Sequence, residues 1–169
     1  ATQGITGVSA SEVEIKSHIQ FYSGIKTADI QETLIKSAAD LISEETPNYQ
    51  YVAGRLINYA LRKEVYGDYD PCSLLDLVKR NVERGFYDEQ LLNAFTEEEW
   101  LELNTAVDHT KDENFTYVAM EQWRGKYLVQ NRVTGEIYEK PQMAFPKVNK
   151  FGMERIIKCK TGSGLKLLL

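Results

Sequence analysis

PNYQYVAGRLINYALRKEVYG, residues 47–67, has the pattern of one long helix. Thr46 can cap its start, Pro47 suits the first helical position, and Gly67 ends the pattern. Four residues in between recur at helical spacing and share one side, namely Val52, Leu56, Tyr59 and Lys63. We therefore expect a helix from Pro47 to about residue 66.

Helix signals continue on both sides of this stretch. Ser11 and Glu14 fit a capping box at the start of a helix over 11–21, and Thr27 can cap a helix over 28–43. Three further helices are expected: from Ser73 to near Gly85, from a capping box at Thr96 and Glu99 to about Val107, and from Phe115 to Trp123. The polar stretch 108–114 between the last two is expected to be a loop.

The period of the pattern changes after residue 125. Residues 126–131 and 136–139 flank Thr134-Gly135, which predicts a β-hairpin. A second hairpin is expected to pair residues 155–160 with 165–169. The expected fold class is therefore mainly α: a helical bundle, a second helical domain and a short β-hairpin, with a C-terminal β-hairpin tail.

Composition bounds the class of protein. The 169 residues are 43% hydrophobic and 27% charged, as in a soluble globular protein of one or two domains. The net charge of −5 argues against a nucleic-acid partner. No run approaches the roughly 18 apolar residues that span a membrane. Because no signal peptide is evident, we expect a cytoplasmic protein with no membrane partner.

Catalytic and metal-binding patterns are scarce. Cys72 and Cys159 are far apart and form no CxxC pair, and the two histidines share no ligand spacing, so we expect no metal site. The motifs of phosphate-binding loops, dinucleotide folds, serine hydrolases and zinc proteases are missing from the sequence. Asp108, His109 and Asp112 are expected to be capping or solvent features of a polar loop. No catalytic residue is predicted.

The C-terminal segment differs from the rest in charge. Residues 146–169 carry six basic residues and one acid, a net charge of +5, so the preceding residues carry −10. One interpretation is a basic hairpin lying on its own acidic body. Another is an assembly segment that adds strands to a partner's sheet. The partner-binding residues would be the apolar ones: Ile156, Ile157, Leu165, Leu167, Leu168 and Leu169.

Three ordered blocks give the sequence a family resemblance. They are SHIQFYSGIKTADIQETLIKSAADLI (17–42), NYQYVAGRL (48–56) with LRKEVYG (61–67), and GKYLVQNRVTGEIYEKPQ (125–142). They resemble the large, catalytic subunit of class I ribonucleotide reductase, without gaps from about Gly4 to Phe145. The ending Pro141-Gln142-Met143-Ala144-Phe145 is similar to phage versions of that subunit.

The resemblance implies four regions. Residues 1–66 are similar to the later part of the ATP cone, the module with which the family senses ATP against dATP. Residues 67–125 are similar to the helical domain that follows it. Residues 126–145 resemble a hairpin at the entry to the catalytic barrel, and residues 146–169 form an atypical tail.

The resemblance also places four residues at nucleotide contacts. Thr27 and Lys63 match the family in type, Tyr59 replaces the usual phenylalanine near the base, and Gln31 stands where many members have histidine. Thr27 as a helix cap, and Tyr59 with Lys63 as the edge of a packed helix, are the simpler interpretations. Because the hairpin and first helix that open the family's cone have no counterpart in this sequence, ATP or dATP is expected to bind weakly as a cofactor.

The catalytic residues implied by the resemblance lie elsewhere. The family's radical cysteine, redox cysteine pair and carboxylate follow the part that this chain resembles, and neither Cys72 nor Cys159 matches them. The chain alone is therefore expected to be inactive. The leading hypothesis is the N-terminal part of a large subunit split over two polypeptides, which assembles with a catalytic barrel polypeptide and with the radical-generating small subunit.

Three other interpretations stay open. The chain could be a non-catalytic adaptor or regulatory module derived from a degenerate ATP cone. Transcriptional control, as in cone-containing zinc-ribbon repressors, is disfavoured because the sequence has no CxxC pair. A product of an interrupted gene would have no function at all, and its apolar terminus would be prone to aggregation.

Overall fold

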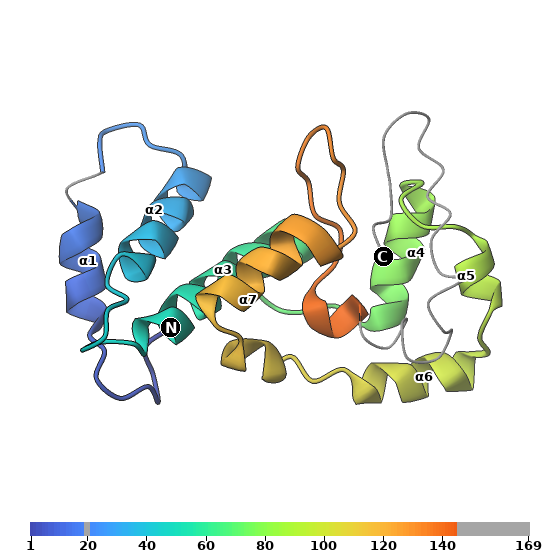
Figure 1. The fold of residues 1–169 in the computed structure, drawn as a ribbon. Coiled ribbons are helices and arrows are strands. Elements are labelled where there is room, and N and C mark those ends of the chain that lie inside the picture. Colours follow the sequence, from blue (N-terminus) through green and yellow to red (C-terminus); the bar gives the residue numbers. More distant parts are fainter. Residues whose placement is uncertain (19–20, 145–169) are drawn as a thin grey trace. The chain divides into compact units, whose positions relative to one another are not determined.

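The computed structural model describes residues 1–18 and 21–144, and these are mainly helical, as predicted (Figure 1). The α-helices are α1 (Ala10–His18), α2 (Thr27–Ala39), α3 (Tyr49–Tyr66), α4 (Leu74–Glu83), α5 (Gln90–Asn93), α6 (Glu97–Ala106) and α7 (Tyr117–Gln122). A 3₁₀ turn covers Lys111–Asn114 and a π-helical turn covers Trp123–Tyr127. Within the described ranges, no helix combines the length and the apolar character needed to cross a membrane.

The chain divides into two compact units, which the α3 helix joins. Among the described residues, unit 1 contains residues 1–18, 21–60 and 110–122, and unit 2 contains residues 61–109 and 123–144. This division follows packing, whereas the four expected regions follow a family resemblance. The expected boundaries of those regions therefore stay a prediction.

Unit 1 is built on the first three turns of α3. Its buried cluster takes Val13 from α1, Ala38 from α2, and Tyr49, Val52 and Ala53 from α3. Burying one aliphatic side chain stabilises a fold by about 1.5–3 kcal/mol, so this cluster holds the three helices together. Arg55 adds polar contacts, since its guanidinium donates to the carbonyls of Gln3 (2.6 Å) and Glu113 (3.2 Å).

The buried Tyr49 hydroxyl sets the start of α1. It accepts the Ser9 N–H at 2.8 Å and donates to the Glu12 carboxylate. Burial, followed by the Glu12 contact, raises the pKa of Tyr49, so the phenol is a neutral donor. Tyr49 thus holds Ser9, the residue just before the helix, which begins at Ala10, and Ser11 lies within the first turn of that helix. The capping box predicted for Ser11 and Glu14 is therefore wrong.

The second helix differs from prediction at both ends. Lys26, not Thr27, is the N-cap residue of α2 and makes no side-chain capping bond, so Thr27 is already helical. The helix ends at Ala39 instead of residue 43. Beyond it, the Thr46 hydroxyl donates to the Leu41 carbonyl at 2.7 Å and holds these residues in a turn.

A glycine allows close packing against α3. A Cβ built on Gly54 would lie 2.2 Å from the Phe115 carbonyl oxygen and 3.0 Å from the carbonyl carbon of Thr116. Both obstacles are backbone atoms, which cannot rotate away. The absence of a side chain at Gly54 is therefore what lets this loop lie directly on the helix.

Unit 2 confirms two predicted helix starts. The Ser73 side chain caps α4 by accepting the Asp76 N–H at 3.1 Å, and Gly85 follows the helix with a φ of +75°. The capping box of Thr96 and Glu99 opens α6. The short α5 was not predicted. The helices share a buried core that includes Leu74, Leu77, Val78, Leu91 and Trp100.

The region after α6 corrects three predictions. The loop expected over 108–114 contains the 3₁₀ turn, and the helix expected over 115–123 is the shorter α7 followed by the π-helical turn. The hairpin expected over 126–139 is reduced to one antiparallel bridge, between Gln130 and Ile137, and no strand is present in the described residues.

Two local features shorten this hairpin. The π-helical turn takes Lys126 and Tyr127. The Val129 N–H donates to the carboxylate of Glu139 at 3.1 Å, not to a strand carbonyl. The second predicted hairpin, over 155–169, lies outside the described residues.

Candidate functional site

The four predicted nucleotide contacts lie in pairs on two helices. Thr27 is the first residue of α2 and is exposed, and Gln31 lies one turn later and is partly buried. Tyr59 and Lys63 lie one turn apart on α3, and both are exposed. Each pair therefore shares a helix face. Nucleotide binding by these residues stays a prediction, and so does partner binding by the six apolar residues of 156–169, which lie outside the described residues.

An additional aromatic ring lies beside Lys63. The Lys63 ammonium is 5.2 Å from the centre of the Tyr69 ring, in a cation–π contact. Such contacts contribute about 0.5–1 kcal/mol at exposed sites. Tyr69 is not among the four nucleotide contacts predicted from the sequence. Its position two residues after the helix-ending Gly67 was the available signal, because the turn there brings the chain back toward the last turn of α3.

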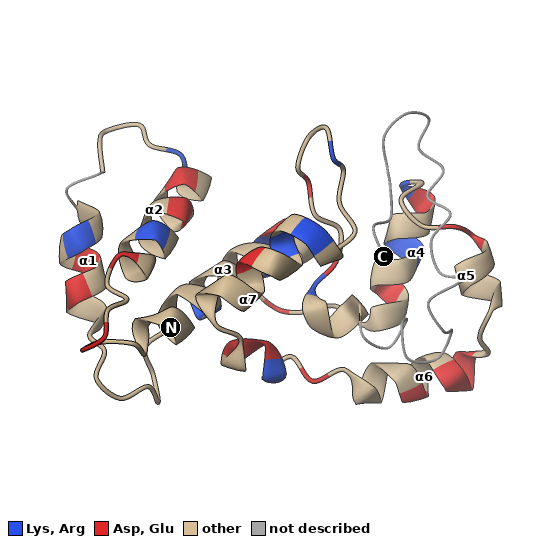
Figure 2. Ribbon diagram, in the orientation of Figure 1, with Lys and Arg blue, Asp and Glu red and all other residues tan. Residues whose placement is uncertain are grey.

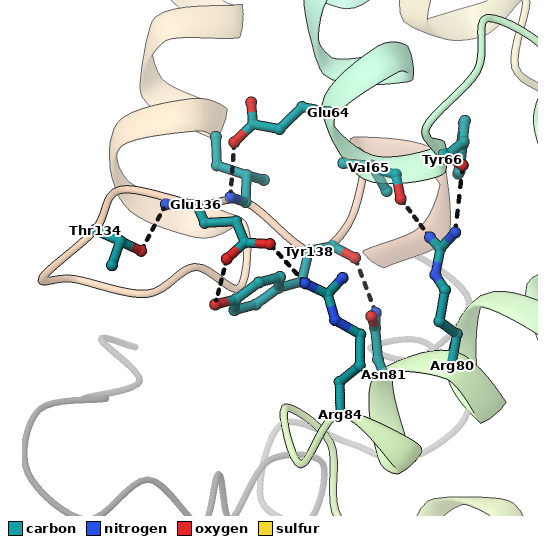
Figure 3. Close-up of polar contacts among 10 residues, drawn as sticks. Glu64, Val65, Tyr66, Arg80, Asn81, Arg84, Thr134, Glu136 and Tyr138 are labelled. Carbon is teal, nitrogen blue, oxygen red and sulfur yellow. Dashed lines mark hydrogen bonds and ion pairs between the residues drawn. The ribbon is translucent and has the colours of Figure 1, made fainter.

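Polar contacts in unit 2 join α4 to α3 and attach the segment 136–140 to both helices (Figure 3). At the end of α3, the Arg80 guanidinium donates to the carbonyls of Val65 and Tyr66. These carbonyls lack partners within the helix, and a cation also complements the negative end of the helix dipole. Arg80 thus caps α3 from the neighbouring helix.

Asn81 is the buried centre of this network. Its side-chain amide donates to the Tyr138 carbonyl at 2.9 Å. Its backbone carbonyl accepts the N–H groups of Phe86 (2.7 Å) and Tyr87 (3.1 Å). One residue therefore joins α4, the turn after it and the segment 136–140.

Charged residues nearer the surface make further contacts with the segment 136–140. The Glu64 carboxylate accepts the Ile137 N–H at 2.8 Å. Arg84 pairs with Glu136 at 2.8 Å and lies 4.6 Å above the Phe86 ring, which stacks on Tyr138 with 3.6 Å between centroids. The side chains of the Arg84–Glu136 pair are 46% and 43% exposed, so solvent screens the pair and it adds little stability by itself.

A second buried contact completes the attachment. The Tyr87 hydroxyl donates to Glu139 at 2.6 Å, and both residues are buried. Burial, and then the Glu139 charge, raises the pKa of Tyr87 well above its usual value. The phenol is therefore a permanent donor and the carboxylate its acceptor. This arrangement fixes structure, and we assign it no chemistry.

Cys72 does not have the surroundings of a reactive thiol. It is partly buried, and burial, opposed by the charge of Arg80, raises its pKa. A raised pKa lowers the fraction of nucleophilic thiolate at neutral pH. Within residues 1–18 and 21–144, no three His, Cys, Asp or Glu residues come together as metal ligands.

The polar loop residues are less solvated than predicted. Asp112 is fully buried in the 3₁₀ turn of unit 1, so the solvent interpretation is wrong for it. In unit 2, His109 is partly buried, and its ring is nearly perpendicular to the Tyr66 ring, with 6.2 Å between centroids. Burial first, and then the charges of Lys140 and Arg62, lower the pKa of His109 to about 4.

The lowered pKa of His109 predicts acid sensitivity. Its ordinary pKa is 6.5, so between about pH 6.5 and 4 the unfolded chain takes up a proton that the folded chain does not. Stability from this group is complete above pH 6.5 and falls as the pH is lowered. We expect urea unfolding at pH 7, 6 and 5 to show a smaller pH dependence for His109→Gln than for the wild type. His18→Gln, at an exposed helix end, is the control. If His109→Gln kept the pH dependence of the wild type, His109 would not be the cause of the acid sensitivity.

Comparison with known proteins gives the chain its relatives. No family model matches it. Its 145 matched residues are nevertheless similar to the N-terminal region of ribonucleoside-diphosphate reductase alpha subunits, the class that the three sequence blocks resemble. The identity is 55% to ribonucleoside-diphosphate reductase 1 subunit alpha of Escherichia coli (strain K12) and 54% to the subunit alpha of Haemophilus influenzae. It is 45% over 141 residues to the subunit alpha of Enterobacteria phage T4.

This similarity shows homology, and it is confined to one part of the relatives. Each of the two bacterial matches covers 86% of this chain but 19% of the relative. The chain thus spans about a fifth of the length of these alpha subunits. The predicted resemblance to the reductase large subunit is confirmed.

Proposed function

We propose that this chain is the non-catalytic N-terminal part of a ribonucleoside-diphosphate reductase and contributes to deoxyribonucleotide synthesis by assembling with a second polypeptide that carries the catalytic barrel. The observation that carries the proposal is the 55% identity to a reductase alpha subunit over 145 residues. The surroundings of Cys72 agree with it, because a partly buried thiol with a raised pKa suits packing better than redox chemistry. In the complete enzyme, a radical-generating small subunit is a further expected partner.

The polar network of unit 2 supports a role as a docking platform. Asn81, Glu64 and the pair of Tyr87 and Glu139 hold the segment 136–140 against α3 and α4. The resemblance assigns this segment to the entry of the barrel. A segment fixed in this way presents one conformation to a partner, so less conformational entropy is lost on assembly.

Nucleotide sensing is the second part of the proposal. We infer that Thr27, Gln31, Tyr59 and Lys63 contact ATP or dATP. The N-terminus of α2, with the exposed Thr27, suits phosphate through its free N–H groups and dipole. Lys63 offers an exposed cation, and Tyr59 an exposed ring for the base. The Lys63 ammonium also contacts the Tyr69 ring. A bound phosphate would therefore compete with that ring for the ammonium.

Lys63→Gln is expected to weaken nucleotide binding by about tenfold or more, because a hydrogen bond to a charged group contributes about 1.5–3 kcal/mol. Isothermal titration of the whole chain with ATP and with dATP measures the effect. Lys79→Gln, which removes another exposed lysine, on α4, should bind like the wild type. Equal losses in both variants would assign the effect to net charge and contradict a site at Lys63.

The adaptor hypothesis is the second candidate. It is favoured by the buried polar groups of unit 2, where Asn81, Tyr87 and Glu139 find their bonds within the chain itself. A chain with this function would be isolated as a stable species without a barrel polypeptide. The two candidates therefore differ in what accompanies the chain in its native source.

A further inference from the structure

The solvent side of α6 combines carboxylates with an exposed leucine. Leu101 is 68% exposed, whereas Trp100, the residue before it, is buried. Residues three and four positions apart share a helix face. We call the exposed residues on this side the acidic α6 face: Glu97, Glu98, Leu101, Glu102 and Thr105. Figure 2 shows the acidic residues along this helix.

In the described structure, the carboxylates of the acidic α6 face neither cap the helix nor form ion pairs. Capping of α6 is done by Thr96 and Glu99, which are not members of the face. Among the ion pairs of the described residues, none involves Glu97, Glu98 or Glu102. Several other strongly exposed apolar side chains have a basic neighbour in the sequence, as do Ile15, Tyr127 and Val133. Leu101 instead has acidic neighbours, so its surroundings select a basic and apolar occupant.

The chain itself contains a segment of that chemistry. Residues 146–169 carry a net charge of +5 and two apolar clusters, Ile156-Ile157 and Leu167-Leu168-Leu169. The segment follows Ala144, which belongs to the same unit as α6. Twenty-four residues can extend to roughly 80 Å, whereas a unit of about 70 residues has a radius of gyration of roughly 11 Å. The reach of the segment therefore does not limit the contact.

We propose that the basic segment 146–169 docks on the acidic α6 face of the same molecule. Its lysines lie beside Glu97, Glu98 and Glu102, and one of its apolar clusters covers Leu101. Opposite charges select this face over the others, and burial of the leucine adds apolar contact. The inference goes beyond the proposed function, because it concerns a contact made by the isolated chain.

Zero-length carbodiimide crosslinking of the full chain, followed by peptide mass spectrometry, tests the contact. The reagent joins a carboxylate to a lysine only when the two are in contact. We expect lysines of 146–169 to crosslink to Glu97, Glu98 or Glu102 at least fivefold more often than to Glu44 and Glu45, which are also exposed. These crosslinks should fall steeply in 1 M salt, where screening acts within about 3 Å.

Two matched variants separate the surface from a general charge effect. Leu101→Lys places a repelling charge in the acidic α6 face and is expected to reduce the crosslinks at least threefold. Val133→Lys adds the same charge at another strongly exposed position of unit 2 and should leave them unchanged. Circular dichroism checks that both variants keep the helical fold.

Isotope labelling decides whether the contact is within one molecule. In an equimolar mixture of ¹⁵N-labelled and unlabelled chains, the proposal predicts crosslinks between peptides of the same label and none between peptides of different label. Mixed-label crosslinks in the roughly one-half share expected for contacts between molecules, or crosslinks spread evenly over exposed carboxylates, would overturn it. Such a result would leave the proposed function intact, because that function is judged by co-isolation with a barrel polypeptide.

Discussion

Replacing Gly54 by alanine is expected to destabilise unit 1 by about 1–3 kcal/mol, the usual cost of overpacking a tight contact. The new methyl group would lie 2.2 Å from the Phe115 carbonyl oxygen, so the loop before α7 must move away from α3. Helix propensity alone predicts the opposite sign, because alanine stabilises a helix by about 1 kcal/mol relative to glycine. The sign of the change in the free energy of unfolding therefore decides whether the contact exists.

Urea unfolding followed by circular dichroism measures this change. Gly125→Ala is the control, because its added Cβ meets nothing within 4 Å and its φ is not positive. We expect it to leave stability unchanged or to raise it by up to about 1 kcal/mol. If Gly54→Ala proved as stable as the control or more so, the close approach of residues 115–116 to α3 would be refuted.

Replacing Asn81 by alanine is the second change with a large expected effect. It removes the amide that donates to the buried Tyr138 carbonyl at 2.9 Å. An unsatisfied buried acceptor costs about 1–3 kcal/mol, and the lost side-chain volume adds to that cost. The backbone contacts of residue 81 with Phe86 and Tyr87 remain, so α4 itself should persist.

Hydrogen exchange shows where the effect of Asn81→Ala is felt. The amide protons of Ile137 and Tyr138 are bonded to Glu64 and Val129, and we expect them to exchange at least tenfold faster in the variant. Asn93→Ala, at the exposed end of α5, should leave both rates unchanged. Wild-type exchange at these two amides in Asn81→Ala would contradict the role of Asn81 as the attachment point.

Local sequence signals predicted the helices well where one side chain controls the boundary. Ser73 and the Thr96–Glu99 capping box start their helices as expected, since each side chain bonds the first turn of its own helix. The failures involve partners distant in sequence. The α1 start depends on Tyr49, 40 residues away from Ser9. No pattern within the first 20 residues contains that information.

The same distinction applies to the hairpin and to the candidate site. Alternation predicted two strands over 126–139, but the carboxylate of Glu139 takes the Val129 N–H that a strand would need. Gly54 fits a helical pattern, and only the position of Phe115 shows why a glycine stands there. The four nucleotide positions came from a family resemblance, and helix spacing shows only that they lie in pairs on α2 and α3.

Native mass spectrometry of the untagged protein from its own source tests the central claim most directly. The spectrum gives the mass of the intact chain and of any polypeptide that stays bound to it. The account predicts a complex with a larger polypeptide, whose peptides match the remaining four-fifths of the reductase alpha subunits and include the cysteines of the barrel. A 19.3 kDa chain that travels alone, under conditions in which reductase activity is retained in other fractions, would contradict it.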